Sequence, residues 1–295
     1  MDVRVDLWVD LWVDLWGDVW GDVWGSPTLT AMSALPDHDR LQAAGLALGL
    51  EGAVATITLD RPERRNPMTP TTWRTLAGIG AGLPGHVQVV VVKGAGEAFS
   101  AGLDRSMLSP DGPPGEQGFL ELLELSDDEF ADEIAGYQEG FVWLSRPDLV
   151  TIAQVHGYAI GAAFQLALAC DLRVVADDVQ FCMKEPALGL VPDLAGTKPL
   201  VSAVGYARAL EICATARYVG ATEAAAIGLA TLVVPREELD ATVADLAQAI
   251  LAHPRDAVSG TKALLQQAAD RSLDDQRRAE RTAQVGLMRA LAAQF

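Results

Sequence analysis

The sequence predicts an α/β fold, in which a mainly parallel sheet is followed by a helical C-terminal region. Short β-type runs alternate with helix-like segments between residues 41 and 235. One of these runs, "VQVVVVKG", is a continuous valine stretch typical of a strand that is buried on both faces. After Pro235 every segment carries an apolar stripe at helical spacing. We therefore expect a core over residues 41–235 and a helical region over residues 236–295.

The first half of this core is expected to begin with a hairpin. The run "LALGLEGAVATITLD" has two short strand patterns around Glu51 and Gly52. "RPERRNPM" ends the second strand, residues 71–83 have helical periodicity, and the valine strand follows. After the loop "GAGEAFSAGLDRSML", the residues from Ser109 to Asp128 are rich in Gly, Pro and acidic residues. This composition indicates a mobile cover.

The second half alternates again between helix and strand. "DEFADEIAGYQEGFVWL" has helical periodicity, "LVTIAQV" and "DLRVVA" are strand-like, and the apolar run between them predicts a short buried helix starting near Gly161. Residues from Lys184 to Thr197 form a Gly/Pro loop, and a helix is expected to begin near Thr197. Three C-terminal helices complete the chain.

The first 40 residues differ from the rest and predict a low-complexity, disordered tail. A four-residue period fills residues 5–24 and holds five of the seven tryptophans. A translated DNA repeat, or a start codon assigned too far upstream of Met32, explains this pattern; a self-association segment is the alternative. Aspartate recurs in the repeat and no basic region precedes it, so it resembles neither a signal peptide nor a membrane span.

Composition narrows the classes of function. The chain has 295 residues and a net charge of −18, with a sequence pI near 4.5, which argues against nucleic-acid and anionic-membrane partners. Its three cysteines lie in apolar segments without CxxC spacing, which favours a reducing, cytoplasmic setting. The four histidines show no metal-ligand spacing, so no metal is expected, and His156 is interpreted as structural.

One polar side chain interrupts the apolar run "GYAIGAAFQLALACD". Gln165 must find hydrogen-bond partners there, because an unpaired buried amide costs about 1–3 kcal/mol. It is either a satisfied core amide or part of an active site.

Three stretches in order, "ITLDRPERRNPM", "GAGEAFSAGLD" and "VHGYAIGAAFQLALACDLRVVADDVQFCMKEPALGLVPDLAGT", closely resemble the crotonase superfamily, that is, the enoyl-CoA hydratase/isomerase family. The resemblance implies a spiral of βαβ units with a helical C-terminal trimerisation region. It also implies a homotrimer or a dimer of trimers. The substrate would be an acyl-CoA thioester, and no cofactor beyond the coenzyme A of the substrate would be needed.

The resemblance further implies an oxyanion hole formed by the backbone N–H groups of Leu103 and Ala162, which would hold the thioester oxygen as an enolate forms. Ala162 also stands at the start of the predicted buried helix, where free N–H groups favour an anion. Where the family usually has three glycines, this chain has Gly161, Ala162 and Ala163. The alternative is that these alanines only pack the helix.

Hydratases of the family use two glutamates, and at the first of these positions this chain has Gln165, while the second is retained as Glu185. Asp193, eight residues beyond Glu185, matches an acid of the dienoyl-CoA isomerases of the family. We expect Glu185 to be the principal base and acid, Asp193 the second proton carrier, and Gln165 a polar positioner. The alternatives are a loop glutamate, a turn or helix-cap aspartate, and a core amide.

By the same resemblance, residues lining the coenzyme A path are expected at Arg64, Arg65, Ala101, Leu103, Asp104, Gly161 and Lys262. The cations among them are alternatively solvated surface charges. The missing first glutamate favours double-bond isomerisation through an enolate. The alternatives are an enoyl-CoA hydratase that uses one glutamate with a water oriented by Gln165, and a catalytically silent CoA-binding or scaffolding protein.

Overall fold

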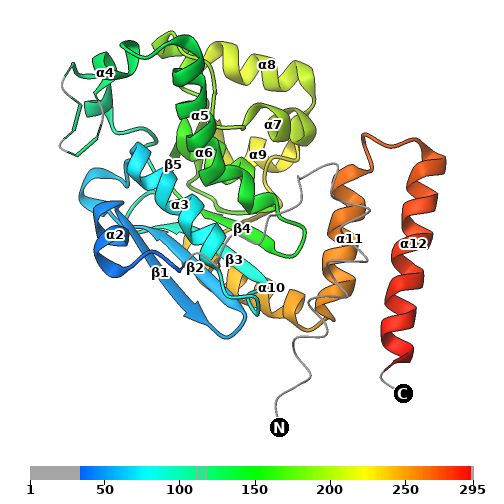
Figure 1. Ribbon diagram of the computed structural model, residues 1–295. Helices are drawn as coiled ribbons and strands as arrows, with labels where there is room; N and C mark the ends of the chain where they lie inside the picture. Colours follow the sequence, from blue (N-terminus) through cyan, green and yellow to red (C-terminus); the bar gives the residue numbers. More distant parts are fainter. Residues whose placement is uncertain (1–33, 111, 114, 117, 294–295) are drawn as a thin grey trace.

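The computed structural model describes residues 34–110, 112, 113, 115, 116 and 118–293 (Figure 1). The predicted tail therefore lies outside the described residues up to residue 33, and α2 begins inside its last part. The helices are α2 (His38–Ala43), α3 (Pro70–Gly82), α4 (Phe119–Leu123), α5 (Asp127–Val142), α6 (Ala162–Ala169), α7 (Thr197–Val204), α8 (Tyr206–Thr215), α9 (Ala221–Ala226), α10 (Leu239–Leu251), α11 (Arg255–Gln267) and α12 (Leu273–Ala292).

A six-stranded sheet organises the molecule, in the order β1-β2-β3-β4-β6-β9. Its strands are β1 (Leu46–Glu51), β2 (Val54–Leu59), β3 (Val89–Gly94), β4 (Val150–Val155), β6 (Leu172–Ala176) and β9 (Leu232–Val234). β1 and β2 form the antiparallel hairpin that the sequence predicts, with Glu51 opposite Val54. The other pairs are parallel.

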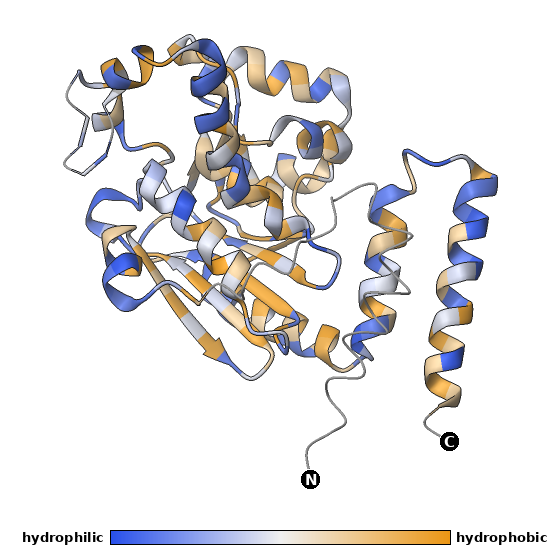
Figure 2. Ribbon diagram, in the orientation of Figure 1, coloured by the Kyte–Doolittle hydropathy of each residue, from blue (hydrophilic) through white to orange (hydrophobic). Residues whose placement is uncertain are grey.

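The valine strand β3 is buried on both faces, as its composition predicts. Val90 and Val92 join the main apolar core, which also includes side chains of α3 and α6. Val89 and Val91 belong to a second core on the other face, which α10 covers. Figure 2 shows the central strands as mainly hydrophobic and the acidic first turns of α5 as hydrophilic.

A second, three-stranded sheet lies beyond β4, and the sequence does not predict it. It consists of β5 (Tyr158–Ile160), β7 (Gln180–Cys182) and β8 (Val219–Gly220). Strands of two or three residues are too short to give a recognisable alternation. This sheet carries the chain from β4 directly into α6, which begins at Ala162, one residue after the predicted start.

The segment expected to be a mobile cover contains more helix than its composition suggests. α4 occupies five residues of it, and α5 begins at Asp127 with Ser126 as its N-cap. A five-residue helix is shorter than two turns, so it leaves no periodic pattern.

α11 and α12 stand to one side of the sheet (Figure 1). On α12, Ala283 is the buried residue, while Leu273 and Met288 are 75% and 60% exposed. None of the described helices is both long enough and apolar enough to cross a membrane.

Candidate active site

Three segments that are distant in the sequence meet at residues 100–104. Met68 N donates to Gly102 O at 2.8 Å, and Asp104 N donates to Met68 O at 2.8 Å. On the other side, Ile160 N donates to Ser100 O at 3.2 Å. The loop "SAGLD" is therefore held between the chain at Met68 and strand β5. Gly102 O and Asp104 N, on either side of Leu103, take part in this pairing, whereas the Leu103 N–H does not.

Gly102 brings this loop against the start of α6. Its φ is +84°, and a Cβ added there would lie 2.1 Å from Ile160 O and 3.5 Å from Ala162 N. Only glycine fits such an approach. The two residues expected to form the oxyanion hole, Leu103 and Ala162, are thereby brought together. Ala162 is the first residue of α6, and a first-turn N–H has no carbonyl partner within its helix.

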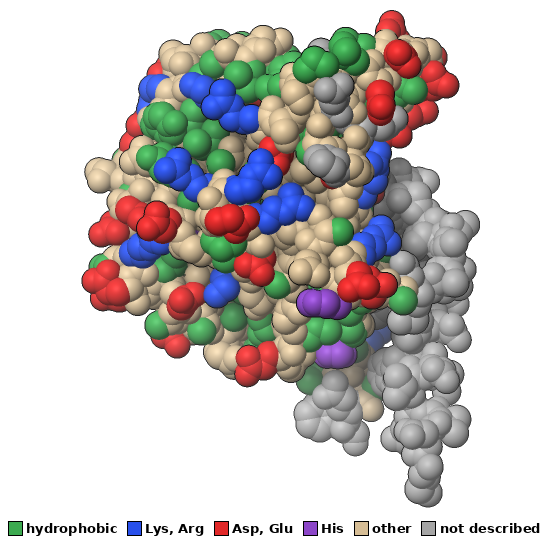
Figure 3. Space-filling view, turned by 90° about the vertical axis from the view of Figure 1, so that its left-hand side faces the viewer, with side chains coloured by type: hydrophobic (Ala, Val, Ile, Leu, Met, Phe, Trp, Pro, Cys, Tyr) green, Lys and Arg blue, Asp and Glu red, His purple; other side chains and the backbone are tan. Residues whose placement is uncertain are grey.

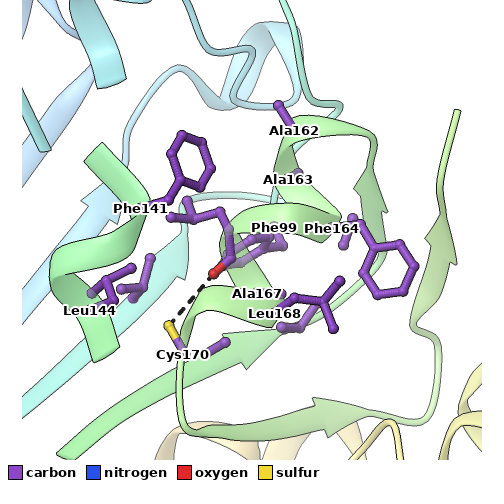
Figure 4. Close-up of a cluster of buried hydrophobic side chains, with 14 of the residues drawn as sticks. Phe99, Phe141, Leu144, Ala162, Ala163, Phe164, Ala167, Leu168 and Cys170 are labelled. Carbon is purple, nitrogen blue, oxygen red and sulfur yellow. Dashed lines mark hydrogen bonds between the residues drawn. The ribbon is translucent and has the colours of Figure 1, made fainter. Parts of the chain in front are cut away.

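The position of α6 is fixed largely by apolar packing. Phe99 and Phe141 lie in the same buried cluster as Phe164 and Ala163 of the helix, and Ala163 has no exposed surface (Figure 4). The Phe164 ring lies 5.0 Å from that of Phe181, centroid to centroid. Both alanines that replace the family's glycines are accommodated in this core. The N-terminus of α6 is consequently held rigidly beside Gly102.

A carboxylate lies directly against this N-terminus. Gly161, with φ +56°, precedes α6 and donates its N–H to Cys182 O at 2.8 Å. A Cβ at Gly161 would lie 3.3 Å from Glu185 Oε1. Glu185 begins a 3-10 turn (Glu185–Leu188) and is 9% exposed. The acid and the expected oxyanion-hole residues therefore occupy the same site.

The Gln165 amide is fully buried and bonded at both ends. Its Nε2 donates to Glu185 Oε1 at 2.7 Å, while its Oε1 accepts from Leu194 N at 2.9 Å and Gly196 N at 3.2 Å. Because two N–H donors fix the oxygen, the NH₂ must face Glu185. Gln165 is thus a satisfied buried amide, and it is also a direct neighbour of Glu185.

The second acid, Asp193, lies on the loop that Gln165 holds. Gln138 Nε2, on α5, donates to Asp193 O at 2.7 Å. Burial raises the pKa of Asp193. Burial also raises the pKa of Glu185; the negative charge of Asp193 acts in the same direction, and the hydrogen bond from Gln165 opposes it. Glu185 Oε2 is buried and makes no hydrogen bond to any described residue. Two carboxyl groups with raised pKa, one of them with a free oxygen, suit proton transfer.

The cations expected along the coenzyme A path divide into two groups. Arg64 is 54% exposed and pairs with buried Asp104, Nη1 to Oδ2, at 3.0 Å. Arg65 lies over the Tyr158 ring, 5.7 Å from its centroid. Ala101, whose N donates to Arg65 O at 2.8 Å, belongs to the same neighbourhood. Figure 3 shows Lys and Arg side chains gathered on the face that is at the left of Figure 1, although the protein is acidic overall.

Lys262 does not join this group. It is 9% exposed, and its ammonium donates to Arg146 O, Leu149 O and Asp171 Oδ2 at 2.6 to 2.8 Å. All three of its N–H donors are occupied, so the expected phosphate contact is not available in this structure. An amphipathic position on a helix looks the same in the sequence whether its cation faces solvent or the core.

Sequence reasoning missed two polar residues that support the site. Asn66, with φ +53°, donates to Ala98 O at 2.8 Å and accepts from Arg61 N at 2.9 Å, which fixes the start of the "SAGLD" loop. The dipeptide Asn-Pro in "RRNPM" marked a turn, but its distant partners left no signal. Gln138 is the other, on a helix with ordinary periodicity.

Comparison with known proteins agrees with this architecture. A family model described as enoyl-CoA hydratase/isomerase matches residues 49–293. The human mitochondrial Delta(3,5)-Delta(2,4)-dienoyl-CoA isomerase is 32% identical over 82% of this chain and 74% of its own length. The peroxisomal dienoyl-CoA isomerase of Arabidopsis thaliana is 34% identical over 61% of this chain, and the match spans 64% of the Arabidopsis protein.

A Thermobifida fusca protein solved in complex with CoA has a TM-score of 0.85 and 50% identity, covering 88% of this chain and 99% of its own. A Thermobifida fusca protein solved in complex with acetoacetyl-CoA has a TM-score of 0.84 and 51% identity, covering 87% of this chain and 99% of its own. These matches confirm the predicted fold class and the resemblance carried by the three sequence stretches. The chain belongs to the enoyl-CoA hydratase/isomerase family, the crotonase superfamily.

Proposed function

We propose that the protein isomerises a double bond in an enoyl-CoA or dienoyl-CoA thioester through an enolate. The observation that carries this proposal is the neutral amide of Gln165, which donates to Glu185 Oε1 and accepts from the backbone of the loop that carries Asp193, while burial raises the pKa of both acids. In the proposed reaction, the Glu185 carboxylate removes a proton from the acyl chain. The C–H electron pair shifts toward the thioester, whose oxygen becomes the enolate held by the N–H groups of Leu103 and Ala162. Asp193 then supplies a proton to a carbon farther along the chain, and the double bond has moved.

The different hydrogen bonding of the two acids supports this division of labour. Burial raises the pKa of both carboxyl groups, and for Asp193 no hydrogen bond from another described side chain opposes this rise. The base must be ionised, and the hydrogen bond from Gln165 Nε2 stabilises the Glu185 carboxylate. The free Glu185 Oε2 is the oxygen that would receive the proton.

The hydratase alternative assigns Gln165 the task of orienting a water. The Gln165 oxygen already accepts two backbone N–H groups, and one of its two N–H donors is engaged by Glu185. One donor is left, which is a weak means of holding a nucleophilic water. This geometry favours the isomerase. The third alternative is a catalytically silent scaffold. Burying a carboxylate with a free oxygen costs folding free energy, and a scaffold would gain nothing in return, which disfavours this alternative.

The substrate would be held by its coenzyme A moiety along Arg64, Arg65, Ala101 and Asp104, and the likeness to a Thermobifida protein solved with CoA supports a substrate that carries coenzyme A. We further propose a homotrimer or a dimer of trimers joined through the C-terminal helices, since apolar side chains of α12 are exposed in the single chain. A cytoplasmic setting is proposed from the three thiols, which are all free.

Mass spectrometry of 2-enoyl-, 3-enoyl- and dienoyl-CoA after incubation with the enzyme in heavy-oxygen water tests the reaction. A shifted double bond without oxygen uptake is the expected result. Labelled oxygen at the β carbon would overturn the proposal in favour of hydration. No change in any thioester would leave the silent reading standing.

A further inference from the structure

The loop that carries Asp193 depends on two glutamine side chains for its position. It connects the Glu185–Leu188 turn to α7. Within the described chain, Leu200 N of the following helix α7 donates to Gly196 O, and the other three hydrogen bonds that tie residues 191–196 to other elements are all made by Gln138 or Gln165. Gln165 bonds both to Glu185 and to this loop, whereas the hydrogen bond of Gln138 goes to the Asp193 carbonyl.

The loop is not in a relaxed conformation. Ala195 has φ +61°, in the left-handed region, which costs a residue with a side chain about 1–2 kcal/mol. Such a conformation persists when neighbouring contacts hold it. On one side of Ala195 the Leu194 side chain is buried, and on the other Gly196 packs against Gln165, where a Cβ would lie 2.6 Å from Gln165 Cγ. Asp193, before Leu194, is anchored at its carbonyl by Gln138.

Gln138 stands on a rigid support. The neighbouring residue Tyr137 is 5% exposed, and its ring lies 5.3 Å from that of Trp73 on α3, centroid to centroid. One turn later, a Cβ at Gly140 would lie 2.4 Å from Trp73 O, so α5 and α3 are in backbone contact. The backbone of Gln138 is consequently held in place by the packing of α5 on α3, and its Nε2 reaches the Asp193 carbonyl from this support.

We propose that Gln138 is a positioning residue for the second proton transfer: its hydrogen bond to Asp193 O sets where the Asp193 carboxyl stands relative to Glu185. The inference rests on the proposed function of Asp193 as proton carrier. Gln138 acts through the loop backbone, and its hydrogen bond involves neither Glu185 nor Gln165. Its loss therefore separates the two proton transfers, which a general loss of folding cannot do.

The test compares two rates in full-length variants. Gln138→Met keeps the length of the side chain and removes the donor; Gln138→Lys retains a donor; Glu139→Gln, at an exposed position of the same helix, is the matched control. The first rate is solvent exchange of the α-protons of a saturated acyl-CoA, followed by NMR in heavy water. The second is isomerisation of the enoyl- or dienoyl-CoA substrate.

In Gln138→Met we expect exchange to stay within about twofold of wild type while isomerisation falls by about 10- to 100-fold, the size expected for a misplaced catalytic group. Gln138→Lys should recover most of the isomerisation, and Glu139→Gln should change neither rate. Equal loss of both rates, or no loss of isomerisation in Gln138→Met, would overturn the proposal.

A second readout does not depend on turnover. The carboxyl carbon of Asp193, assigned with Asp193→Asn in protein labelled with carbon-13, should titrate at a lower pKa in Gln138→Met than in wild type, because a released loop exposes the group to water. An unchanged titration would also overturn the positioning role. If wild type does not isomerise but the titration moves, the proposed function fails, and the result shows only that Gln138 sets the surroundings of the Asp193 carboxyl.

Discussion

Replacing Gln165 by methionine should destabilise the protein by several kcal/mol. The variant keeps the length of the side chain and loses the amide. The buried N–H groups of Leu194 and Gly196 lose their acceptor, at about 1–3 kcal/mol each, and Glu185 loses a hydrogen bond to a charged group, worth about 1.5–3 kcal/mol. Ala195, between the two donors, is exposed, so the loop can partly reach water. We therefore expect a loss of about 3–5 kcal/mol, a large part of the 5–15 kcal/mol typical of a domain.

Urea unfolding at a fixed protomer concentration measures this loss as a lower midpoint with an unchanged slope. Gln248→Met, at an exposed position on α10, is the control and should stay within about 0.5 kcal/mol of wild type. If Gln165→Met unfolds at the midpoint of the control, the amide does not hold the loop, and the argument for a structural glutamine fails.

Gln165→Glu extends the same reasoning to pH. It would place a second carboxylate where Nε2 now lies, 2.7 Å from Glu185 Oε1. Two such groups share a proton, which raises their pKa in the folded state above the unfolded value. A raised acid pKa means that stability is lost as the pH rises. The free energy of unfolding of Gln165→Glu should therefore fall further below that of wild type between about pH 4 and pH 8.

Three further outcomes are expected. Glu185→Gln should abolish turnover and raise the melting temperature near neutral pH, because the fold disfavours the ionised group; scanning calorimetry should find that this gain vanishes as the pH falls toward the ordinary value of 4.5. Gly102→Ala, whose Cβ would meet Ile160 O, should lower kcat by at least about 100-fold, whereas Gly49→Ala, with open space around it, should not; equal rates would remove the oxyanion-hole assignment. Lys262→Met should lower the free energy of unfolding in urea by about 3–5 kcal/mol and leave KM unchanged. A raised KM at unchanged stability would instead support the phosphate contact expected from the sequence.

The elements that the sequence predicts well are those whose pattern is local. The valines of β3 predict burial on both faces, Glu51-Gly52 predicts the turn of the hairpin, and an apolar run of sufficient length predicts α6. The same holds for Gln165: a glutamine in an apolar run must have partners, and it has three. The identity of these partners depends on the tertiary structure, because Leu194 and Gly196 lie about 30 residues further along the chain.

Lys262 and Gln138 illustrate the opposite case. Each is a polar residue on an amphipathic helix, and helical periodicity does not tell whether such a side chain reaches water or a buried carbonyl. Lys262 reaches two carbonyls and Asp171, and Gln138 reaches the Asp193 carbonyl. Both contacts span more than 50 residues of sequence, and only the packing of whole elements brings them together.

The expected anion-binding groups at Leu103 and Ala162 belong to the backbone, which has a consequence for how this protein tolerates mutation. Any residue except proline supplies an N–H, so many substitutions at these two positions would preserve the electrostatics of the site. Substitutions should instead be harmful at Gly102, which has no room for a side chain, and at Asn66, whose side chain bonds to the Ala98 carbonyl ahead of the loop. In a saturation-mutagenesis map of catalytic activity, the donors would look permissive, and the residues that never touch the substrate would look essential.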